Sequence, residues 1–252
     1  MKNPWFLAVF AILVVSAALG CASGPEEPIS WTEPEDPVLY KQRMRELVIA
    51  LSRYGRAVDP EFIVIPQNGN ELLTLDGKIG SAPAVDYIQE IDGIGREDLF
   101  YGYTADNQET PAEAIRYMLP YLHLGLDNDL TVMVIDYCRR HSLIDDSYSR
   151  NQREGFISFA APRRNLTVIP GYPDPIFSEH AGEVTTLGQA RNFLFLINPE
   201  AFSGKESFLS ALGRTNYDLI VIDAFVDGPE GPEWLEAGDI RSLQRKPGGG
   251  SR

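Results

Sequence analysis

Two adjacent carboxylates, Glu97 and Asp98, are the clearest chemical signal in the sequence. They stand between glycines and an aromatic run in residues 91–103, which read IDGIGREDLFYGY. Adjacent carboxylates repel one another, and such a pair suits proton transfer to and from a substrate. Successive side chains of a strand point to opposite faces, so only one of the two would face inward. The alternative is structural: Asp98 caps a turn and Glu97 bonds the backbone of a neighbouring strand.

Three further apolar runs also end in polar residues. Residues 62–69 end in Gln67, Asn68 and Gly69, and residues 132–137 end in Asp136 and Tyr137. Residues 219–223 end in Asp223. Where parallel strands share a sheet, such groups gather at one edge and form a site there. Gln67 and Asn68 could equally form a turn whose amides bond the backbone, and Asp223 could be a plain strand-end hydrogen-bonding residue.

Alternating helical and strand patterns position these residues. Apolar residues at helical spacing, with their start and stop signals, predict helices at 38–58, 84–89, 111–124, 187–190, 205–212 and 234–245. Short apolar runs predict strands at 62–65, near 91, 131–136, 156–160, 192–197 and 218–223. Residues 139–153 read as a polar segment and 161–182 as a long loop rich in proline and glycine. These are six β/α units, as in a doubly wound sheet or a (β/α)8 barrel. No glycine-rich nucleotide fingerprint follows a strand, which favours the barrel.

The first 37 residues read as a targeting signal and a tether. Lys2 and an apolar run at 5–15 precede Leu19-Gly20-Cys21, which resembles the lipobox of a bacterial lipoprotein. Residues 1–20 would then be a signal peptide, and Cys21 would carry the lipid that anchors the protein to the cell-envelope membrane. The alternatives are a secreted protein or an uncleaved signal anchor. Residues 21–37, rich in proline and glutamate, read as a linker, and residues 38–252 as the folded domain.

Composition excludes some classes of function. Without Lys2 the chain has 21 basic residues against 36 acidic ones, a net charge of −15, which argues against nucleic acid as a partner. An acidic surface suits a cationic polymer, although it is as often a solubility feature.

The three histidines are far apart and no metal-ligand spacing occurs, so we expect no metal and no cofactor. Cys138 follows an apolar run and reads as a small buried filler rather than a nucleophile.

Three of the motifs resemble glycoside hydrolase family 114, the endo-α-1,4-polygalactosaminidases and related TIM-barrel proteins. The motifs are IPQNG at 65–69, IDGIGREDLFYG at 91–102 and VIDY at 134–137, and YDLIVID at 217–223 looks like an early strand of these barrels. In the family that early strand precedes the others, so the order here looks circularly permuted. The family's Ser-Ile-Gly-Glu-Ala-Glu and Tyr-Leu-Asp strands are absent from this chain. The resemblance therefore implies a TIM-barrel type domain with about six of eight β/α units, cut short at its C-terminus.

The resemblance also implies a function. It makes Glu97 the acid/base of a two-carboxylate hydrolysis of an amino-sugar polymer such as polygalactosamine, with the second carboxylate on a missing strand. The candidate substrate-binding residues are Gln67, Asn68, Asp98, Tyr101, Asp136, Tyr137 and Asp223. The alternative is a non-catalytic lipoprotein, either carbohydrate-binding or a remnant.

Overall fold

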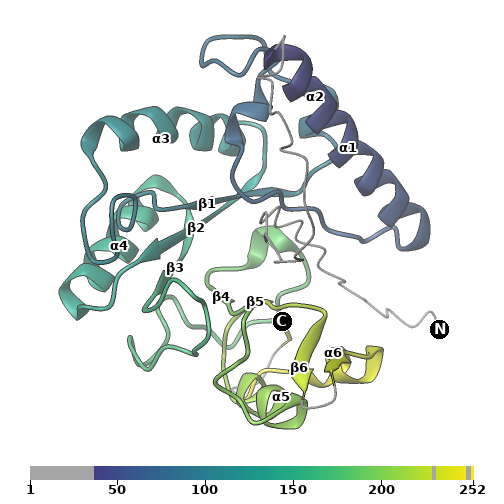
Figure 1. Cartoon of the computed structure of the whole chain (residues 1–252), viewed down its shortest axis with the longest axis vertical. Helices are drawn as coiled ribbons and strands as arrows, with labels where there is room; N and C mark the ends of the chain where they lie inside the picture. The colour runs from purple at the N-terminus through teal and green to yellow at the C-terminus, as the bar shows by residue number, and fades with distance from the viewer. Residues whose placement is uncertain (1–36, 229–230, 248–250) are drawn as a thin grey trace, which may run out of the picture.

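The computed structural model describes residues 37–228, 231–247 and 251–252, which form a mixed α/β fold (Figure 1). The helices are α1 (Pro37–Val58), η1 (Asn70–Leu73), α2 (Val85–Ile88), α3 (Ala112–Leu126), α4 (His141–Glu154), η2 (Leu187–Gln189), α5 (Lys205–Gly213) and α6 (Ala237–Leu243). The strands are β1 (Gly93–Glu97), β2 (Thr131–Tyr137), β3 (Ile157–Ala161), β4 (Phe193–Phe195), β5 (Leu219–Val221), β6 (Phe225–Gly228) and β7 (Gly231–Trp234). The predictions for residues 1–36, which include the signal peptide, lipidated Cys21 and most of the linker, fall outside the described residues.

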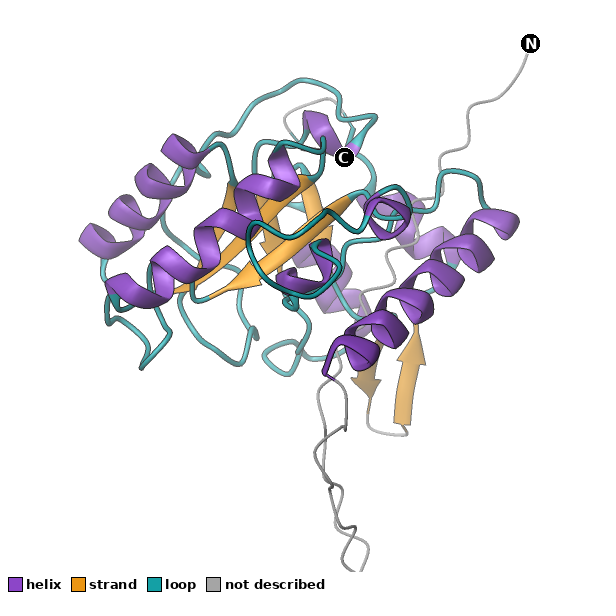
Figure 2. Ribbon diagram, turned by 90° about the horizontal axis from the view of Figure 1, so that it is seen from above, coloured by secondary structure: helices purple, strands orange, loops and turns teal. Residues whose placement is uncertain are grey.

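The centre of the fold is a three-stranded parallel sheet in the order β1-β2-β3. Residues 64–68 run beside β1 without forming a strand. The bonds from Asp92 N to the Val64 carbonyl and from Gly95 N to the Pro66 carbonyl hold them there, with a parallel bridge between Gln67 and Gly95. The strand expected at 62–65 is thus an extended segment at the sheet edge. Figure 2 shows the parallel strands as a central layer among the helices.

The two faces of the sheet bury two separate hydrophobic cores. Along β2, Val132 and Val134 point into the core shared with α3 and α4. Met133 and Ile135 point to the opposite core, which includes Phe193 of β4. This is the alternation that a strand buried on both faces requires. It explains why the run at 131–136 is apolar throughout, and its prediction as a strand is confirmed by β2.

The expectation of a TIM-barrel type fold with six of eight units is wrong. The described strands form sheets of three, two and two strands, not a closed ring. Phe159 of β3 packs against Phe193 of β4 with ring centres 5.9 Å apart, but no ladder pairs these two strands in the described part of the chain. After β5 the chain forms the antiparallel β6–β7 hairpin before it reaches helix α6, which lies within the helix predicted at 234–245.

The barrel prediction fails because the pairing of strands depends on contacts between segments far apart in the sequence. The pattern of apolar runs reports which segments are buried strands, but it does not report which strands pair. Here β4 and β5 are three residues each and pair only with one another. Strands this short leave the sheet divided, and a barrel needs an unbroken ladder around its whole circumference.

Two elements were not predicted as they occur. The segment at 139–153, which was read only as polar, is helix α4. The helix was not predicted because its buried apolar face consists of little more than Ile144 and Tyr148, with Ser147 and Asn151 buried beside them. The β6–β7 hairpin lies in a segment in which we expected no strands. Among the described residues, no helix is both long and apolar enough to cross a membrane.

Candidate active site and ligand cavity

Glu97 ends β1 and is held by two neighbouring side chains. The Tyr137 hydroxyl donates to Glu97 Oε1 at 3.0 Å, and Asn68 Nδ2 donates to Glu97 Oε2 at 3.4 Å. The Glu97 backbone N–H in turn donates to Asn68 Oδ1 at 3.2 Å. Both partners are neutral, and no Lys, Arg or His in the described ranges forms an ion pair with Glu97. Glu97 therefore makes no ion pair with a described side chain, although the adjacent Arg96 interacts with it electrostatically.

Burial and the nearby charge of Glu97 raise the pKa of the Tyr137 phenol. The hydroxyl therefore stays protonated at neutral pH and remains a donor to Glu97. The Arg164 guanidinium carbon lies 3.9 Å from the centre of the Tyr137 ring, a cation–π arrangement that holds the ring in place.

Arg164 itself is fully engaged by acidic partners. Its Nη2 lies 2.9 Å from Asp98 Oδ1 and donates to the Gly102 carbonyl, and its Nε lies 2.8 Å from Asp106 Oδ1. Burial opposes the charge of Arg164, but the bonds to Asp98 and Asp106 outweigh it and raise the guanidinium pKa. Asp98 thus neutralises Arg164 and leaves Glu97 as the unpaired charge of the site.

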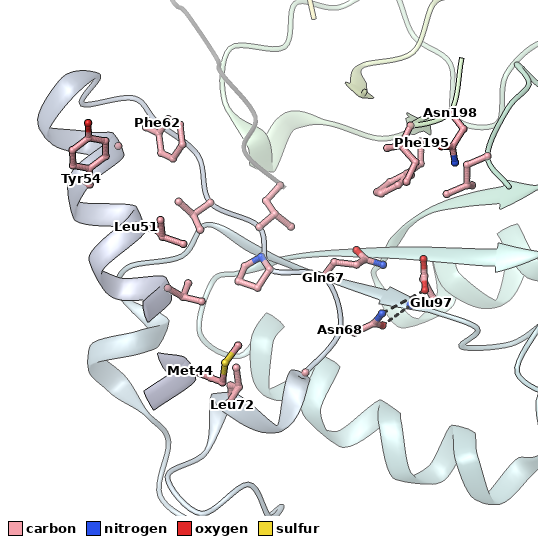
Figure 3. Close-up of a pocket in the computed structure, with 18 of the residues that line it drawn as sticks. Met44, Leu51, Tyr54, Phe62, Gln67, Asn68, Leu72, Glu97, Phe195 and Asn198 are labelled. Atoms are coloured by element: carbon pink, nitrogen blue, oxygen red, sulfur yellow. Dashed lines mark hydrogen bonds between the residues drawn. The ribbon is translucent and has the colours of Figure 1, made fainter. Parts of the chain in front are cut away.

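A cavity of about 910 Å³ opens beside Glu97 (Figure 3). Its polar lining comes from the sheet end, and the figure places Gln67, Asn68, Glu97 and Asn198 together there. Its remaining lining is largely apolar. Part of it comes from α1 and the segments after it, namely Met44, Val48, Leu51, Val58, Phe62 and Leu72, and part from the side of β4, namely Leu166, Phe195 and Ile197. A concave, mainly apolar space with a few convergent polar groups is the usual form of a small-molecule site.

The backbone around Glu97 is strained. Asn68 has φ of 61° and Asp98 has φ of 59°, in the left-handed region that non-glycine residues rarely adopt. Strain of this kind costs on the order of 1–3 kcal/mol and is concentrated at functional sites. Gly95 has a related role: a Cβ at this position would overlap the Gln67 side chain. These features together allow Gln67 and Asn68 to lie directly against the end of β1.

The structure brings four of the predicted site residues together and separates the rest. Gln67, Asn68, Glu97 and Tyr137 line the cavity, and Asp98 adjoins it through Arg164. Asp223 does not line the cavity, and burial first, then the charge of Asp227, raises its pKa.

Asp136 and Tyr101 have structural contacts instead. Asp136 is 0% exposed, and its carboxylate accepts bonds from Phe100 N, Tyr101 N, Ser147 Oγ and Asn151 Nδ2. Tyr101 is buried and its hydroxyl donates to Asp146. Both side chains stabilise the loop that follows β1. Cys138 is 1% exposed, which confirms it as a buried filler, and burial raises its thiol pKa.

Sequence reasoning missed Arg164, Asn198 and the lining role of α1. Arg164 comes three residues after β3, so the same rule of strand ends that singled out Glu97 would have found it. Asn198 likewise follows β4. The helix predicted at 38–58, which corresponds to α1, contains none of the predicted site residues. Within the described ranges, no three His, Cys, Asp or Glu residues lie close enough to hold a metal ion.

Comparison with known proteins gives little information on function. No family model matches the chain. An uncharacterized protein of Deinococcus radiodurans is 28% identical over 126 residues, which cover 50% of this chain and 37% of that protein. The chain thus spans little more than a third of the length of the curated relative it matches.

Proposed function

We propose that this protein acts on an amino-sugar polymer, with Glu97 as the acid/base of a glycoside-hydrolase type reaction. The placement of Glu97 carries the proposal: it is a carboxylate without an ion pair among the described residues, at the polar end of a cavity, among amides and a tyrosine hydroxyl. Amides and hydroxyls are suitable partners for sugar hydroxyls, and a carboxylate without a counter-ion suits an ammonium group. The similarity of residues 65–69 and 91–102 to glycoside hydrolase family 114 supports the same substrate class.

The two oxygens of Glu97 have different roles in this scheme. Tyr137 donates to Oε1, so that oxygen is occupied as an acceptor. Oε2 has only the longer 3.4 Å contact with Asn68, and it is the oxygen that would carry the proton to the glycosidic oxygen and later remove one from water. Arg164 and Asn68 hold Tyr137 and Glu97 in position for this transfer.

The second candidate function is carbohydrate binding without cleavage, and one observation favours it. Glycosidases of the usual kind need a second carboxylate about 5–10 Å from the first. Apart from Glu97, the only described carboxylate that lines the cavity is Asp59. The Asp59 backbone carbonyl accepts a hydrogen bond from Phe62 N. Figure 3 shows Phe62 at the α1 end of the cavity, away from Glu97. The described residues therefore supply one member of such a pair at the polar end.

Glu97→Gln distinguishes these functions. With an α-1,4-linked galactosamine polymer, we expect release of reducing ends by the native chain and a loss of about 10²–10⁴-fold in kcat for Glu97→Gln. Glu113→Gln, an exposed glutamate on α3, is the matched control and should retain full activity. Binding of the polymer without cleavage by the native chain would favour the second candidate. A native chain that neither binds nor cleaves it would contradict both.

A further inference from the structure

The cavity has more apolar length than a sugar needs. Most of its polar lining lies at one end, formed by Gln67, Asn68, Glu97 and Asn198, with Tyr137 and Arg164 beside them. Along α1 and directly after it, the polar lining residues are Tyr54 and Asp59. The other arm runs along α1, where Met44, Val48, Leu51 and Val58 recur at helical spacing on one side. Phe62 and Leu72 also line this arm.

A second sugar ring would fit poorly in that arm. Sugar hydroxyls that leave water need hydrogen-bond partners, and each one left without a partner is costly. The apolar side chains of the arm offer none. A hydrocarbon chain, in contrast, gains free energy from burial against the same side chains, and each buried methylene strengthens binding about fourfold.

The charge at the polar end determines the head group. Glu97 has neutral hydrogen-bond partners and no ion pair among the described residues, although the adjacent Arg96 interacts with it electrostatically. Arg164, which lines the same cavity, is already paired with Asp98 and Asp106. A ligand with an ammonium group would supply the missing counter-charge, whereas a carboxylate or phosphate ligand would be repelled. The complementary ligand therefore has a cationic polar head and a hydrocarbon tail.

We propose that the cavity binds an amino sugar joined to an apolar aglycone, with the ammonium-bearing ring at Glu97 and a lipid-like chain along α1. The inference rests on the proposed function for the sugar end and adds the class of the aglycone. The substrate would be an amino-sugar chain carried on a lipid rather than a free polymer in solution.

Calorimetry of the full chain with three probes, each below its micelle concentration, tests the proposal. The probes are octyl 2-amino-2-deoxygalactoside, its methyl counterpart and octyl galactoside. We expect the first to bind at least about tenfold more tightly than either of the others, because only it fills both ends of the cavity. Its binding should also have the more negative heat-capacity change that accompanies burial of apolar surface.

Two leucines of α1 provide matched variants. Leu51 lines the cavity, while Leu47, which is exposed to a similar degree on the same helix, does not. We expect Leu51→Glu to abolish the advantage of the octyl chain and Leu47→Glu to retain it. Glu97→Gln should bind the amino and neutral octyl probes equally, because the counter-charge for the ammonium group is gone.

Several outcomes would overturn the inference. If the methyl and octyl amino sugars bind equally and both depend on Glu97, the sugar site stands and the lipid arm does not. If all octyl probes bind equally, the arm is a non-specific apolar surface. If the octyl probes do not bind, and sedimentation shows a dimer that Leu51→Glu converts to a monomer, the arm is covered by a second copy. Cleavage of the polymer, measured separately, tests the proposed function independently of these results.

Discussion

At the scale of single residues, Asp136 shows how a strand-end carboxylate can be structural. It is fully buried, and its four donors come from the loop after β1 and from α4. By bonding Phe100 N and Tyr101 N it stabilises the loop that includes Asp98, the partner of Arg164. Like Glu97, Asp136 stands near the C-terminal end of a parallel strand. Only the surroundings distinguish a ligand-facing carboxylate from one that organises a loop.

Asp136 predicts a specific pH dependence of stability. Burial raises its pKa above the ordinary value despite the bonds from Ser147, the two backbone groups and Asn151. The folded state then binds the proton more tightly than the unfolded state. The contribution of Asp136 to stability is therefore complete below the ordinary pKa of about 4 and is lost as the pH rises through the raised value.

We expect the free energy of unfolding of the native chain, relative to Asp136→Asn, to decrease between pH 4 and pH 7. Urea unfolding of both proteins across this range measures the difference. Asp86→Asn, an exposed aspartate, is the control and should show no such trend. A difference that increases with pH would mean that the four hydrogen bonds outweigh the cost of burial.

At the scale of elements, the site depends on close contact between β1 and the segment at 64–68. Gln67 bridges Gly95, and the Gln67 side chain occupies the space that a Cβ of residue 95 would need. Asn68 directly follows Gln67, and Glu97 comes two residues after Gly95. This placement lets Asn68 and Glu97 form two hydrogen bonds with each other. A glycine within a strand often marks this kind of close approach.

Gly95→Ala tests this contact. The added methyl group should displace Gln67 from the cavity, lower stability by about 1–3 kcal/mol and weaken binding of an amino sugar by about tenfold. Thermal unfolding and calorimetry measure the two effects. Gly188→Ala is the matched control, because a Cβ there meets open space. Unchanged affinity in Gly95→Ala would exclude Gln67 from the ligand site.

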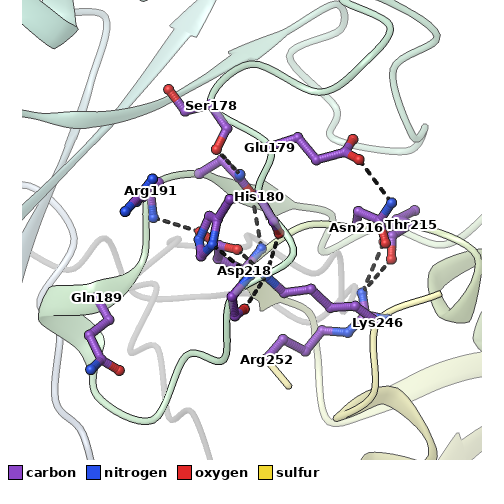
Figure 4. Close-up of polar contacts among 12 residues, drawn as sticks. Ser178, Glu179, His180, Gln189, Arg191, Thr215, Asn216, Asp218, Lys246 and Arg252 are labelled. Carbon is purple, nitrogen blue, oxygen red and sulfur yellow. Dashed lines mark hydrogen bonds and ion pairs between the residues drawn. The ribbon is translucent and has the colours of Figure 1, made fainter. Parts of the chain in front are cut away.

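At the scale of the whole molecule, a buried ionic cluster joins the end of the chain to the fold (Figure 4). Asp218, just before β5, is fully buried and pairs with Lys246, with His180 at 2.9 Å. Lys246 also donates to the carbonyls of His180 and Gly182, and Arg191 N donates to Asp218. The cluster connects the loop before η2, strand β5 and the segment after α6.

Lys246→Met should destabilise the protein by about 3–5 kcal/mol, because it leaves the Asp218 carboxylate buried without its cation. Adding Asp218→Asn removes that charge, and the double variant should recover a large part of the loss. Denaturant unfolding of both variants, with exposed Lys78→Met as the control, measures these changes. A double variant no more stable than Lys246→Met alone would contradict a specific role for this ion pair.

Local patterns in the sequence determined the element types. The apolar run at 131–136 predicted a strand buried on both faces, and helical spacing after Asp36-Pro37 predicted α1. The position of Glu97 at a strand end followed from the same pattern. These features depend on side-chain periodicity over fewer than 25 residues, which the sequence displays directly.

The tertiary structure decided what those elements form. Short β4 and β5 pair with one another instead of extending the sheet, so the strands form an open arrangement and not a barrel. Arg164 reaches Asp98 from 66 residues further along the chain, and α1 lines the cavity that Glu97 faces. Such contacts depend on how segments far apart in the sequence pack together, and local periodicity does not encode that packing. For the same reason the sequence alone pointed to Glu97 as a proton carrier, but not to the apolar arm beside it.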